Sequence, residues 1–425
     1  MLPTPIQEID YFLSDSGSSL FFTDRSGSGR VRSTQAGKIP TVLIDDTGPG
    51  HYAGLLRAAA VEGAVFTPDY PTRAADAAMI CYTSGTTGKP KGAVITHRNL
   101  VSNTVALHKV WQWTDRDVLL HVLPLFHVHG LGVALHGSLY AGSTTLMHER
   151  FDPARVWQAI AEEKCTMFMA VPTIYQRLCK ELAGQRPDLG SMRVFISGSA
   201  PLGESLFKHF EELTGSRILE RYGMTEAQMI ASNPYDPEGR IPGSVGYPLP
   251  GVIIRVAGET GEEVQPGGIG EVWVVGDNVF KGYWQMPGET ARCFAGRWLK
   301  TGDLGYQDPG DRGRLYLVGR AKELVISGGF NVYPKEVENV LEGHDAVLEA
   351  AVIGLEDEDL GEKVVAAVVL RSGEEITASK LVAHCKQYLV GYKCPKEVFF
   401  VSELPRNTMG KVQKQVLKST VAGDG

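Results

Sequence analysis

The sequence predicts an α/β protein with a large N-terminal domain and a smaller α+β domain at its C-terminal end. Three observations support this fold class. Between residues 77 and 222, short apolar runs alternate with stretches of helical length and spacing, which is typical of a doubly wound, mostly parallel sheet. From residue 243, short strand patterns separated by Gly/Pro turns indicate a β-rich subdomain. Beyond residue 320, helical and strand patterns mix in one compact segment.

The elements of the large domain are predicted in chain order. A helix-like run covers residues 6–12, and strands are expected at residues 20–23 and 77–81. Buried strands of the sheet are expected at residues 118–123, 144–147, 166–170, 192–196 and 217–219. Helices are expected at residues 99–110, 153–163, 173–182 and 202–213. Because ligands bind at the carboxyl ends of strands in such sheets, motifs that follow the strands should share one site.

The later elements are shorter and more varied. Strands of the β-rich subdomain, which covers about residues 243–319, are expected at residues 252–256, 271–275 and 314–318. The small domain should contain helices at residues 334–341 and 378–388 and strands at residues 347–353 and 364–370.

Composition excludes several functional classes. The chain has 425 residues, a net charge of −7 and no basic run, which argues against nucleic-acid binding. No apolar stretch approaches a membrane span, and residues 1–10 lack the pattern of a signal peptide. The six cysteines show no CxxC pair or disulfide-like spacing, so reduced thiols and a cytoplasmic location are expected. A mitochondrial protein whose transit peptide is missing from this form would look the same.

Residues 82–92, YTSGTTGKPKG, form the most informative motif of the chain. Glycines let the backbone approach a ligand, and hydroxyl, ammonium and backbone N–H groups all donate to phosphate oxygens. A P-loop is excluded by spacing, because Thr83 stands where that motif needs glycine and Pro90 where it needs Ser or Thr. A Ser/Gly-rich surface linker is the alternative, but the motif lies between an apolar strand and a helix-like run. A nucleotide-phosphate loop of another kind is favoured.

Further motifs follow in a fixed order. They are LPLFHVHG (123–130), SGSAPL (197–202), ERYGMTE (220–226), LKTGDLG (299–305), GRAKELVISGGFNVYPKEVE (319–338) and PRNTMGK (405–411). Together with residues 82–92, this series resembles the adenylate-forming superfamily of acyl-CoA synthetases, luciferases and peptide-synthetase adenylation domains. The forms ERYGMTE, SNPYD (232–236), SGGFNVYPKE and LPRNTMGKVQK are most similar to those of malonyl-CoA synthetases.

The resemblance implies a two-step reaction. ATP adenylates a carboxylic acid with release of pyrophosphate, and the acyl group then passes to CoA with release of AMP. It also implies an AMP-binding domain at residues 1–319, a mobile C-terminal domain at residues 320–425 and a hinge at Lys322. Relatives begin their large domain well before residues 6–12, so the N-terminus is expected to be truncated relative to the family.

The resemblance assigns the nucleotide site. Phosphate binding is expected from Thr83, Ser84, Gly85, Thr86, Thr87, Gly88 and Lys91, with Thr225 beside them. The rest of AMP is expected to contact Gly198, Ser199, Ala200, Pro201, Tyr222, Gly223, Met224, Asp303 and Arg320. Glu226, together with Thr86, should hold Mg²⁺, since a hard cation that bridges phosphates needs only one or two protein ligands.

The same resemblance assigns the reacting groups. Lys411 is the expected catalytic lysine, because an ammonium group near the carboxylate and the α-phosphate would stabilise developing negative charge. His127, Thr225 and Glu226 are expected to act with it. Ser327, Gly328 and Gly329 are expected to line the CoA channel after the small domain rotates. Paired glycines suit a narrow tunnel, and a plain turn is the alternative.

Substrate choice depends on Arg221, which stands where many relatives have a small residue or Asn. If its side chain enters the acyl pocket, a buried cation needs an anion opposite it, and the second carboxylate of malonate supplies one. Alternatively, Arg221 pairs with Glu220 or with solvent. The resemblance adds Val128, His129, Ser199 and Met229 as walls of a small pocket. As a metal pair, His127 and His129 lack a third ligand nearby in the sequence.

Two other functions remain open at the level of sequence. One is a ligase for another short- or medium-chain acid. The other is a truncated nucleotide-binding form without turnover. Small-molecule substrates (ATP, malonate and CoA) are the expected partners, as a monomer or a homodimer.

Overall fold

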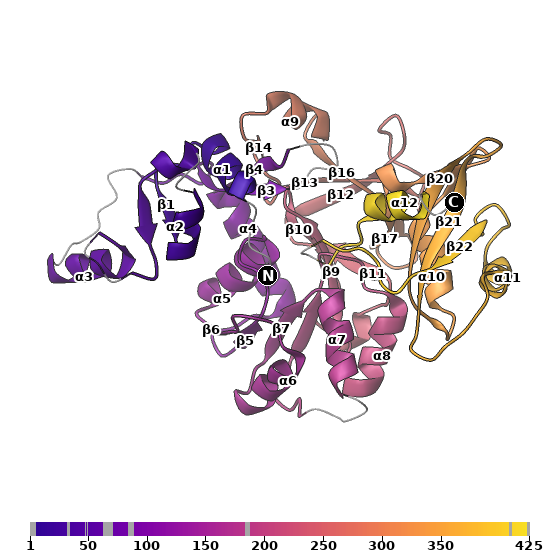
Figure 1. Cartoon of the computed structure of the whole chain (residues 1–425), viewed down its shortest axis with the longest axis horizontal. Helices are drawn as coiled ribbons and strands as arrows, with labels where there is room; N and C mark the ends of the chain where they lie inside the picture. Colours follow the sequence, from indigo (N-terminus) through magenta and orange to yellow (C-terminus); the bar gives the residue numbers. More distant parts are fainter. Residues whose placement is uncertain are drawn as a thin grey trace. The chain divides into compact units, whose positions relative to one another are not determined.

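The computed structural model describes residues 6–422 except 32–34, 47, 49, 63–70, 84–88, 183–187 and 408–409 (Figure 1). The chain divides into two compact units. One combines Met1–His97 with Lys281–Pro287, and the other combines Arg98–Phe280 with Gly288–Gly425. Most of the predicted site residues belong to the second unit, whereas the motif at residues 82–92 belongs to the first.

The first unit contains short helices and two small sheets. Its helices are α1 (Ile6–Asp15), α2 (Arg25–Val31), the 3-10 helix η1 (Gln35–Lys38) and α3 (Tyr52–Glu62). Strands β1 (Phe21–Thr23) and β2 (Thr41–Leu43) pair in parallel. Strands β3 (Ala77–Thr83), β4 (Lys91–Thr96) and β14 (Gly282–Tyr283) form an antiparallel sheet. The helix predicted at residues 6–12 and the strands predicted at residues 20–23 and 77–81 are therefore present.

Strand β4 was not predicted from the sequence. The motif at residues 82–92 joins two antiparallel strands, β3 and β4, and the helix α4 begins only at His97. The strand at residues 77–81 was expected to belong to the main parallel sheet, and it lies instead in this separate sheet of three strands. The run KGAVIT is rich in apolar and β-branched residues, which suits a strand that pairs with β3.

The second unit is built on a twelve-stranded sheet whose first part is parallel. Its order there is β6-β5-β7-β8-β9, and every one of these neighbours is parallel. The bounds are β5 Val118–His121, β6 Thr144–Met147, β7 Met167–Ala170, β8 Val194–Ser197 and β9 Leu219–Met224. This confirms the five predicted strands, although β9 continues five residues beyond the predicted end at residue 219.

Helices cover one face of this parallel region. They are α6 (Pro153–Glu162), α7 (Pro172–Leu182) and α8 (Glu204–Thr214), and α7 and α8 lie side by side (Figure 1). Trp157, Tyr175, Phe195 and Phe210 form a buried aromatic core between these helices and the strands. Burial of apolar surface of this kind is the main force that holds helices on a sheet.

The opposite face is covered by α4 (His97–Trp111), the π-helix η2 (His129–Leu135) and α5 (His136–Ala141). Asn103 of α4 donates to the carbonyl of Met229 at 2.8 Å, and Trp111 Nε1 donates to Ser232 Oγ at 3.0 Å. These bonds attach α4 to the strand that follows β9. A π-helical turn often marks a functional site, and η2 begins at His129 of the LPLFHVHG motif.

Beyond β9 the sheet becomes antiparallel. Its order continues β9-β10-β11-β17-β16-β13-β12, with β15 paired to β16. The bounds are β10 Gln228–Ser232, β11 Ser244–Pro248, β12 Val252–Ala257, β13 Gly270–Gly276, β15 Phe294–Ala295, β16 Trp298–Asp308 and β17 Arg314–Arg320, with η3 at Pro237–Gly239 and α9 at Pro287–Cys293. The predicted β-rich subdomain thus continues the parallel sheet. The reason is local, because a tight turn reverses the chain after β9 and short connections permit only antiparallel pairing.

The C-terminal part has its own sheet, with order β19-β18-β21-β20 and β22 parallel to β21. Its elements are η4 Ala321–Glu323, β18 Val325–Ser327, β19 Phe330–Val332, α10 Pro334–Glu342, β20 Val347–Asp357, β21 Gly361–Leu370, α11 Ala378–Tyr388, β22 Glu397–Phe400 and α12 Lys414–Ala422. Alternate residues of β20 and β21 face two separate cores, which α10 with α11 and α12 complete. Among the described residues of the whole chain, no helix has the length and apolar character needed to cross a bilayer.

Candidate active site

The most unusual side chain of the second unit is Arg221, in the middle of β9. It is 3% exposed, and its Nε and Nη2 atoms have no hydrogen-bond partner among the described residues. Its guanidinium lies against Gly198 at the end of the neighbouring strand, since a Cβ at Gly198 would be 2.4 Å from Arg221 Cζ. Burial lowers the pKa of Arg221 to about 9. The glycine of the SGSAPL motif therefore makes room for a buried cation.

Pairing of Arg221 with Glu220 is not what the structure shows. Successive side chains of a strand point to opposite faces, and Glu220 Oε1 accepts a hydrogen bond from the Leu202 backbone N–H at 2.9 Å on the α8 side. Burial raises the pKa of Glu220 to about 8. Solvent is not the partner of Arg221 either, because the side chain is almost fully covered.

His129 lies within electrostatic range of this guanidinium, and His121 and His127 lie within range of His129. His129 Nδ1 is 3.1 Å from Ser199 Oγ, and burial followed by the charge of Arg221 holds the pKa of His129 well below its usual value. Burial, then the charge of Lys411, lowers the pKa of His127 to about 4. Burial also lowers the pKa of His121, the last residue of β5. All three imidazoles are therefore neutral near pH 7.

The predicted walls of the acyl pocket belong to the same region. Val128 and His129 are buried at the start of η2, and Met229 is buried on β10 opposite Gly223. Ser199 has a φ of 72°, a left-handed conformation that is uncommon for a residue with a side chain and that recurs at ligand sites. His121 was missed by sequence analysis. Its place at the carboxyl end of a parallel strand was the available signal.

The predicted adenosine residues form a connected chain. Tyr222 Oη donates to Asp303 Oδ2 at 2.6 Å, and Arg320 Nε forms a 3.0 Å ion pair with Asp303 Oδ1. Burial, together with the Asp303 charge, holds the pKa of Tyr222 well above its usual value. Strands β9, β16 and the end of β17 thus bring together three residues that lie far apart in the sequence. Of the other predicted contacts, Ala200 is partly exposed, Pro201 is exposed, and Gly223 and Met224 end β9.

Thr225 and Glu226 form the turn between β9 and β10, and Glu226 is buried. Lys411 lies within electrostatic range of this turn. Crowding by protein atoms, followed by the charge of Arg320, lowers the pKa of Lys411, whereas Asp303 and Glu226 act in the opposite direction. Although part of Lys411 is exposed, its ammonium group therefore lies within electrostatic range of the adenosine residues, the turn and Arg221.

Internal hydrogen bonds stabilise the loop that carries Lys411. The Lys411 N–H donates to Asn407 Oδ1 at 3.0 Å. Arg406 donates through Nη1 to the carbonyl of Gly410 at 2.6 Å and through Nη2 to Glu349 Oε2 at 2.5 Å. A Cβ at Gly410 would be 2.8 Å from Thr173 Oγ1 at the start of α7, so the loop lies against the helix face of the large domain.

The phosphate loop belongs to the first unit. Ser84, Gly85, Thr86, Thr87 and Gly88 lie outside the described residues. Thr83 ends β3 and pairs with Lys91, which begins β4. The Lys91 ammonium lies 5.0 Å from the centre of the Tyr283 ring, a cation–π contact that holds the side chain beside β14.

The predicted CoA-channel residues form a tight turn between β18 and β19. Gly328 and Gly329 have φ values of 58° and 79°, which suit a two-residue hairpin turn. Turn geometry thus accounts for both glycines, and the argument from a narrow tunnel is not needed. Ser327 is buried on β18. Lys322, the predicted hinge, lies in the exposed turn η4, whose Glu323 pairs with Lys414 at 3.3 Å.

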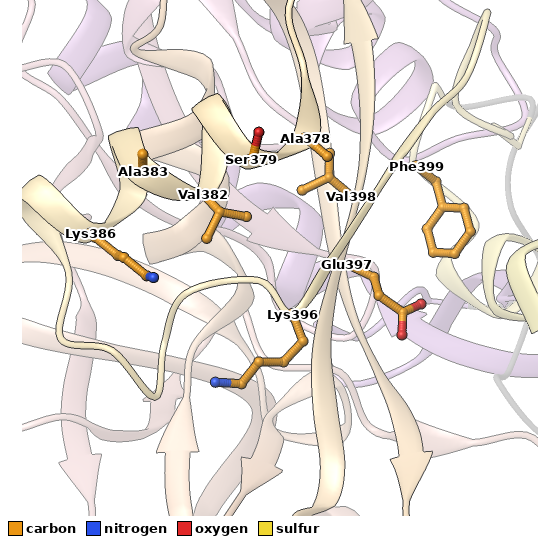
Figure 2. A pocket seen from close by; sticks show the side chains of 9 residues that line it. All are labelled: Ala378, Ser379, Val382, Ala383, Lys386, Lys396, Glu397, Val398 and Phe399. Atoms are coloured by element: carbon orange, nitrogen blue, oxygen red, sulfur yellow. The ribbon is translucent and has the colours of Figure 1, made fainter.

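A groove on the C-terminal domain lies apart from these residues. It has a volume of about 670 Å³, and none of the predicted site residues lines it (Figure 2). Val382 of α11 and Val398 of β22 form its apolar wall, with Lys386 and Lys396 at one end (Figure 2). Within the described residues, no cluster of His, Cys, Asp and Glu could hold a metal ion by itself.

Comparison with known proteins identifies the chain as an adenylate-forming, ATP-dependent acid–thiol ligase. A family model described as AMP-binding enzyme matches residues 3–284, and one described as AMP-binding enzyme C-terminal domain matches residues 336–411. The chain belongs to this family of AMP-forming acyl-CoA ligases.

Its relatives act on different acids. The chain is 39% identical over 411 residues to sulfoacetate–CoA ligase from Cupriavidus necator, covering 96% of this chain and 79% of that one. It is 36% identical over 450 residues to mitochondrial malonate–CoA ligase ACSF3 from Homo sapiens, covering 97% and 76%. The crystal structure of ATP-bound MatB from Rhodopseudomonas palustris is similar, with a TM-score of 0.89, 43% identity and coverage of 98% and 82%.

Proposed function

We propose that the protein joins malonate to CoA at the expense of ATP, with methylmalonate as a second substrate. The observation that carries this proposal is the buried guanidinium of Arg221, whose Nε and Nη2 lack partners among the described residues. Unpaired polar groups in a protein interior are costly, and an anion from the substrate would remove that cost.

The donor pattern matches an anionic group at the far end of a short acid. Nε and Nη2 form one edge of the guanidinium fork, which binds the two oxygens of a carboxylate in a bidentate manner. Two relatives are named for malonate and sulfoacetate, which are both short acids with a second anionic group. Between these two, a carboxylate fits the planar fork best, because its two oxygens lie in one plane with it.

The first step joins the near carboxylate to AMP. A carboxylate oxygen of malonate attacks the α-phosphorus of ATP, the bond to the β-phosphate oxygen breaks, and pyrophosphate leaves. Lys411 would stabilise the charge that develops between the carboxylate and the α-phosphate. Tyr222, Asp303 and Arg320 would bind adenosine, and Arg221 would keep the far carboxylate fixed so that the near one is aligned.

The second step transfers the acyl group. The thiolate sulfur of CoA attacks the acyl carbon, the bond to the phosphate oxygen breaks, and AMP leaves. The hairpin at Ser327, Gly328 and Gly329 would line the path of CoA after a rotation at Lys322. Mg²⁺ would neutralise the phosphates during the first step. Glu226 fits it as a buried carboxylate close to the nucleotide residues.

The test replaces Arg221 by Gly and compares diacids with monoacids. Truncation of one partner of a buried charge pair costs about 2–5 kcal/mol, and each ~1.4 kcal/mol is tenfold. Arg221→Gly should therefore lower malonate turnover at least tens-fold while acetate and propionate turnover is spared. Pyrophosphate release and AMP formation measure this with purified protein, ATP, Mg²⁺ and CoA.

Arg221→Lys is the matched control, since it keeps a cation but loses the fork, and an intermediate loss is expected. Equal losses for malonate and propionate would remove Arg221 from substrate selection. A wild-type preference for a monocarboxylate would favour a ligase for another short- or medium-chain acid. ATP binding without pyrophosphate release across the acid panel would favour a nucleotide-binding form without turnover.

A further inference from the structure

His121 is a buried histidine that the proposed chemistry leaves unexplained. It is 1% exposed, and neither of its ring nitrogens has a hydrogen-bond partner among the described residues. A neutral imidazole carries one N–H donor and one acceptor, so the interior of the protein leaves both unsatisfied. Buried polar atoms in this state call for a partner that the folded chain does not itself supply.

Strand alternation places His121 on the same face of the sheet as Arg221. Leu120 belongs to the core that packs on α6, α7 and α8, so His121 faces the other side, toward η2 and α4. On β9, Ile218 and Glu220 face the α8 side, and Arg221 therefore faces α4. The register agrees, because Arg221 pairs with Ser232, whose hydroxyl accepts the Trp111 N–H of α4.

His129 lies near both side chains. Its imidazole descends from η2 and contacts Ser199 beside Gly198, where the Arg221 guanidinium crosses the end of β8. The pKa of His129 is lowered by electrostatic coupling to Arg221 and to the titration of His121, so both side chains lie within electrostatic range of it. Strands β7 and β8 lie between β5 and β9 in the sheet, and the long Arg221 side chain reaches back over β8 toward His129 and the β5 side.

We propose that His121 is a specificity-determining residue that donates a hydrogen bond to the same distal carboxylate that Arg221 binds. The inference rests on the proposed function, because it needs a substrate with a second anionic group. A carboxylate offers about four lone-pair positions, and the guanidinium fork uses two of them. An imidazole N–H on the opposite side of the pocket satisfies a third, whereas a monocarboxylic acid would present a methyl group to both donors.

The experiment measures the ratio of kcat/KM for malonate to kcat/KM for propionate. His121→Leu should lower this ratio about tenfold or more, because the apolar side chain cannot donate to the distal carboxylate. His121→Asn and His121→Gln, which retain an N–H near one ring nitrogen, should recover part of it. The thermal transition of each variant confirms that it is folded.

His148→Leu is the matched control. His148 follows β6, directly after the residue that pairs with His121, so alternation directs its side chain to the opposite face of the sheet. Its Nδ1 is also buried without a partner among the described residues, yet its substitution should leave the ratio unchanged.

The outcomes separate two failures. An unchanged ratio in His121→Leu, in an enzyme that prefers malonate, overturns the role of His121 alone. Equal losses for malonate and propionate, not recovered by Asn or Gln, also overturn it, since they indicate a general structural role. A wild-type enzyme that does not prefer malonate to propionate refutes the proposed function instead, and Arg221→Gly then shows no selective loss.

Discussion

Two regions of the second unit bury arginines in opposite ways. In the antiparallel region, Arg314 donates to Asp311 at 2.6 Å, to Asn233 at 2.9 Å and to the Tyr247 hydroxyl at 2.9 Å. Nearby, Arg240 donates to the carbonyls of Arg217 at 2.6 Å, Pro234 at 3.3 Å and Tyr235. At the junction with the parallel region, Arg221 is equally buried but lacks partners on Nε and Nη2 among the described residues.

This difference in hydrogen bonding indicates different roles for the buried arginines. A buried cation surrounded by acceptors stabilises the fold, because every donor that lost water has gained a protein partner. A buried cation with open donors destabilises the folded protein, and such groups are typical of ligand sites, where the substrate completes the set. The bonds of Arg240 to three backbone carbonyls thus indicate a structural role.

The largest effect should come from the fully bonded arginine. Arg314→Leu removes hydrogen bonds to Asp311, Asn233 and the Gly239 carbonyl, so the free energy of unfolding should fall by about 3–5 kcal/mol. Denaturant unfolding measures it. Arg312→Leu is the control, since Arg312 is exposed and its guanidinium lies 5.5 Å from the centre of the Tyr247 ring, and it should cost less than about 1 kcal/mol. Similar losses in the two variants would contradict the structural role of Arg314.

A paired arginine can also act on catalysis through its position. Arg406→Ala removes the bonds to Gly410 and Glu349 that brace the Lys411 loop, so acyl-adenylate formation should fall about 10²-fold. Pyrophosphate exchange measures this step, and thioester formation from preformed acyl-adenylate should change little. Glu349→Gln keeps an acceptor and should have a milder effect. If both steps fell equally, disruption of the domain would be the better explanation.

The burial of Glu220, the neighbour of Arg221 on β9, predicts that the stability of the protein depends on pH. Burial raises the pKa of Glu220 to about 8 from its ordinary value of 4.5, so between these values the folded protein keeps a proton that the unfolded chain has lost. This contribution is complete below about pH 4.5, and stability falls as the pH rises toward 8. The Tm of the wild type should therefore fall by several degrees more than that of Glu220→Gln between pH 5 and pH 8. Parallel Tm profiles would show that Glu220 is ionised in the folded state.

The smallest change in the free energy of unfolding is expected for substitution of Arg221. Arg221→Leu removes a buried cation with open donors, so the free energy of unfolding should stay within about 1 kcal/mol of the wild type or rise. Denaturant unfolding without substrate is the measurement. Malonate at saturating concentration should raise the Tm of the wild type but not of this variant. A large destabilisation without substrate would mean that Arg221 has a structural partner, and the contrast with Arg314 would be lost.

Much of the fold followed from local pattern. The parallel strands and the helices α6, α7 and α11 lie within a few residues of their predicted bounds, because apolar periodicity reports burial directly. Strand β4 and helix α12 were missed. β4 directly follows a Gly/Pro-rich loop, and α12 buries only a narrow stripe around Leu417 and Val421. The continuation of one sheet through β9 and β10 was also missed, since pairing between distant strands leaves no local mark.

The sequence by itself determined the family, because its motifs occur in the family's order along almost the whole chain, and it predicted which residue types would bind nucleotide. Only the tertiary structure decided how single side chains are used. It placed Glu220 and Arg221 on opposite faces of one strand, linked Tyr222 to Arg320 through Asp303, and left the ring nitrogens of His121 without partners among the described residues. The physical reason is that a buried polar group forms hydrogen bonds only with atoms that the fold brings within about 3 Å of it. The spacing of residues along the chain does not encode that proximity.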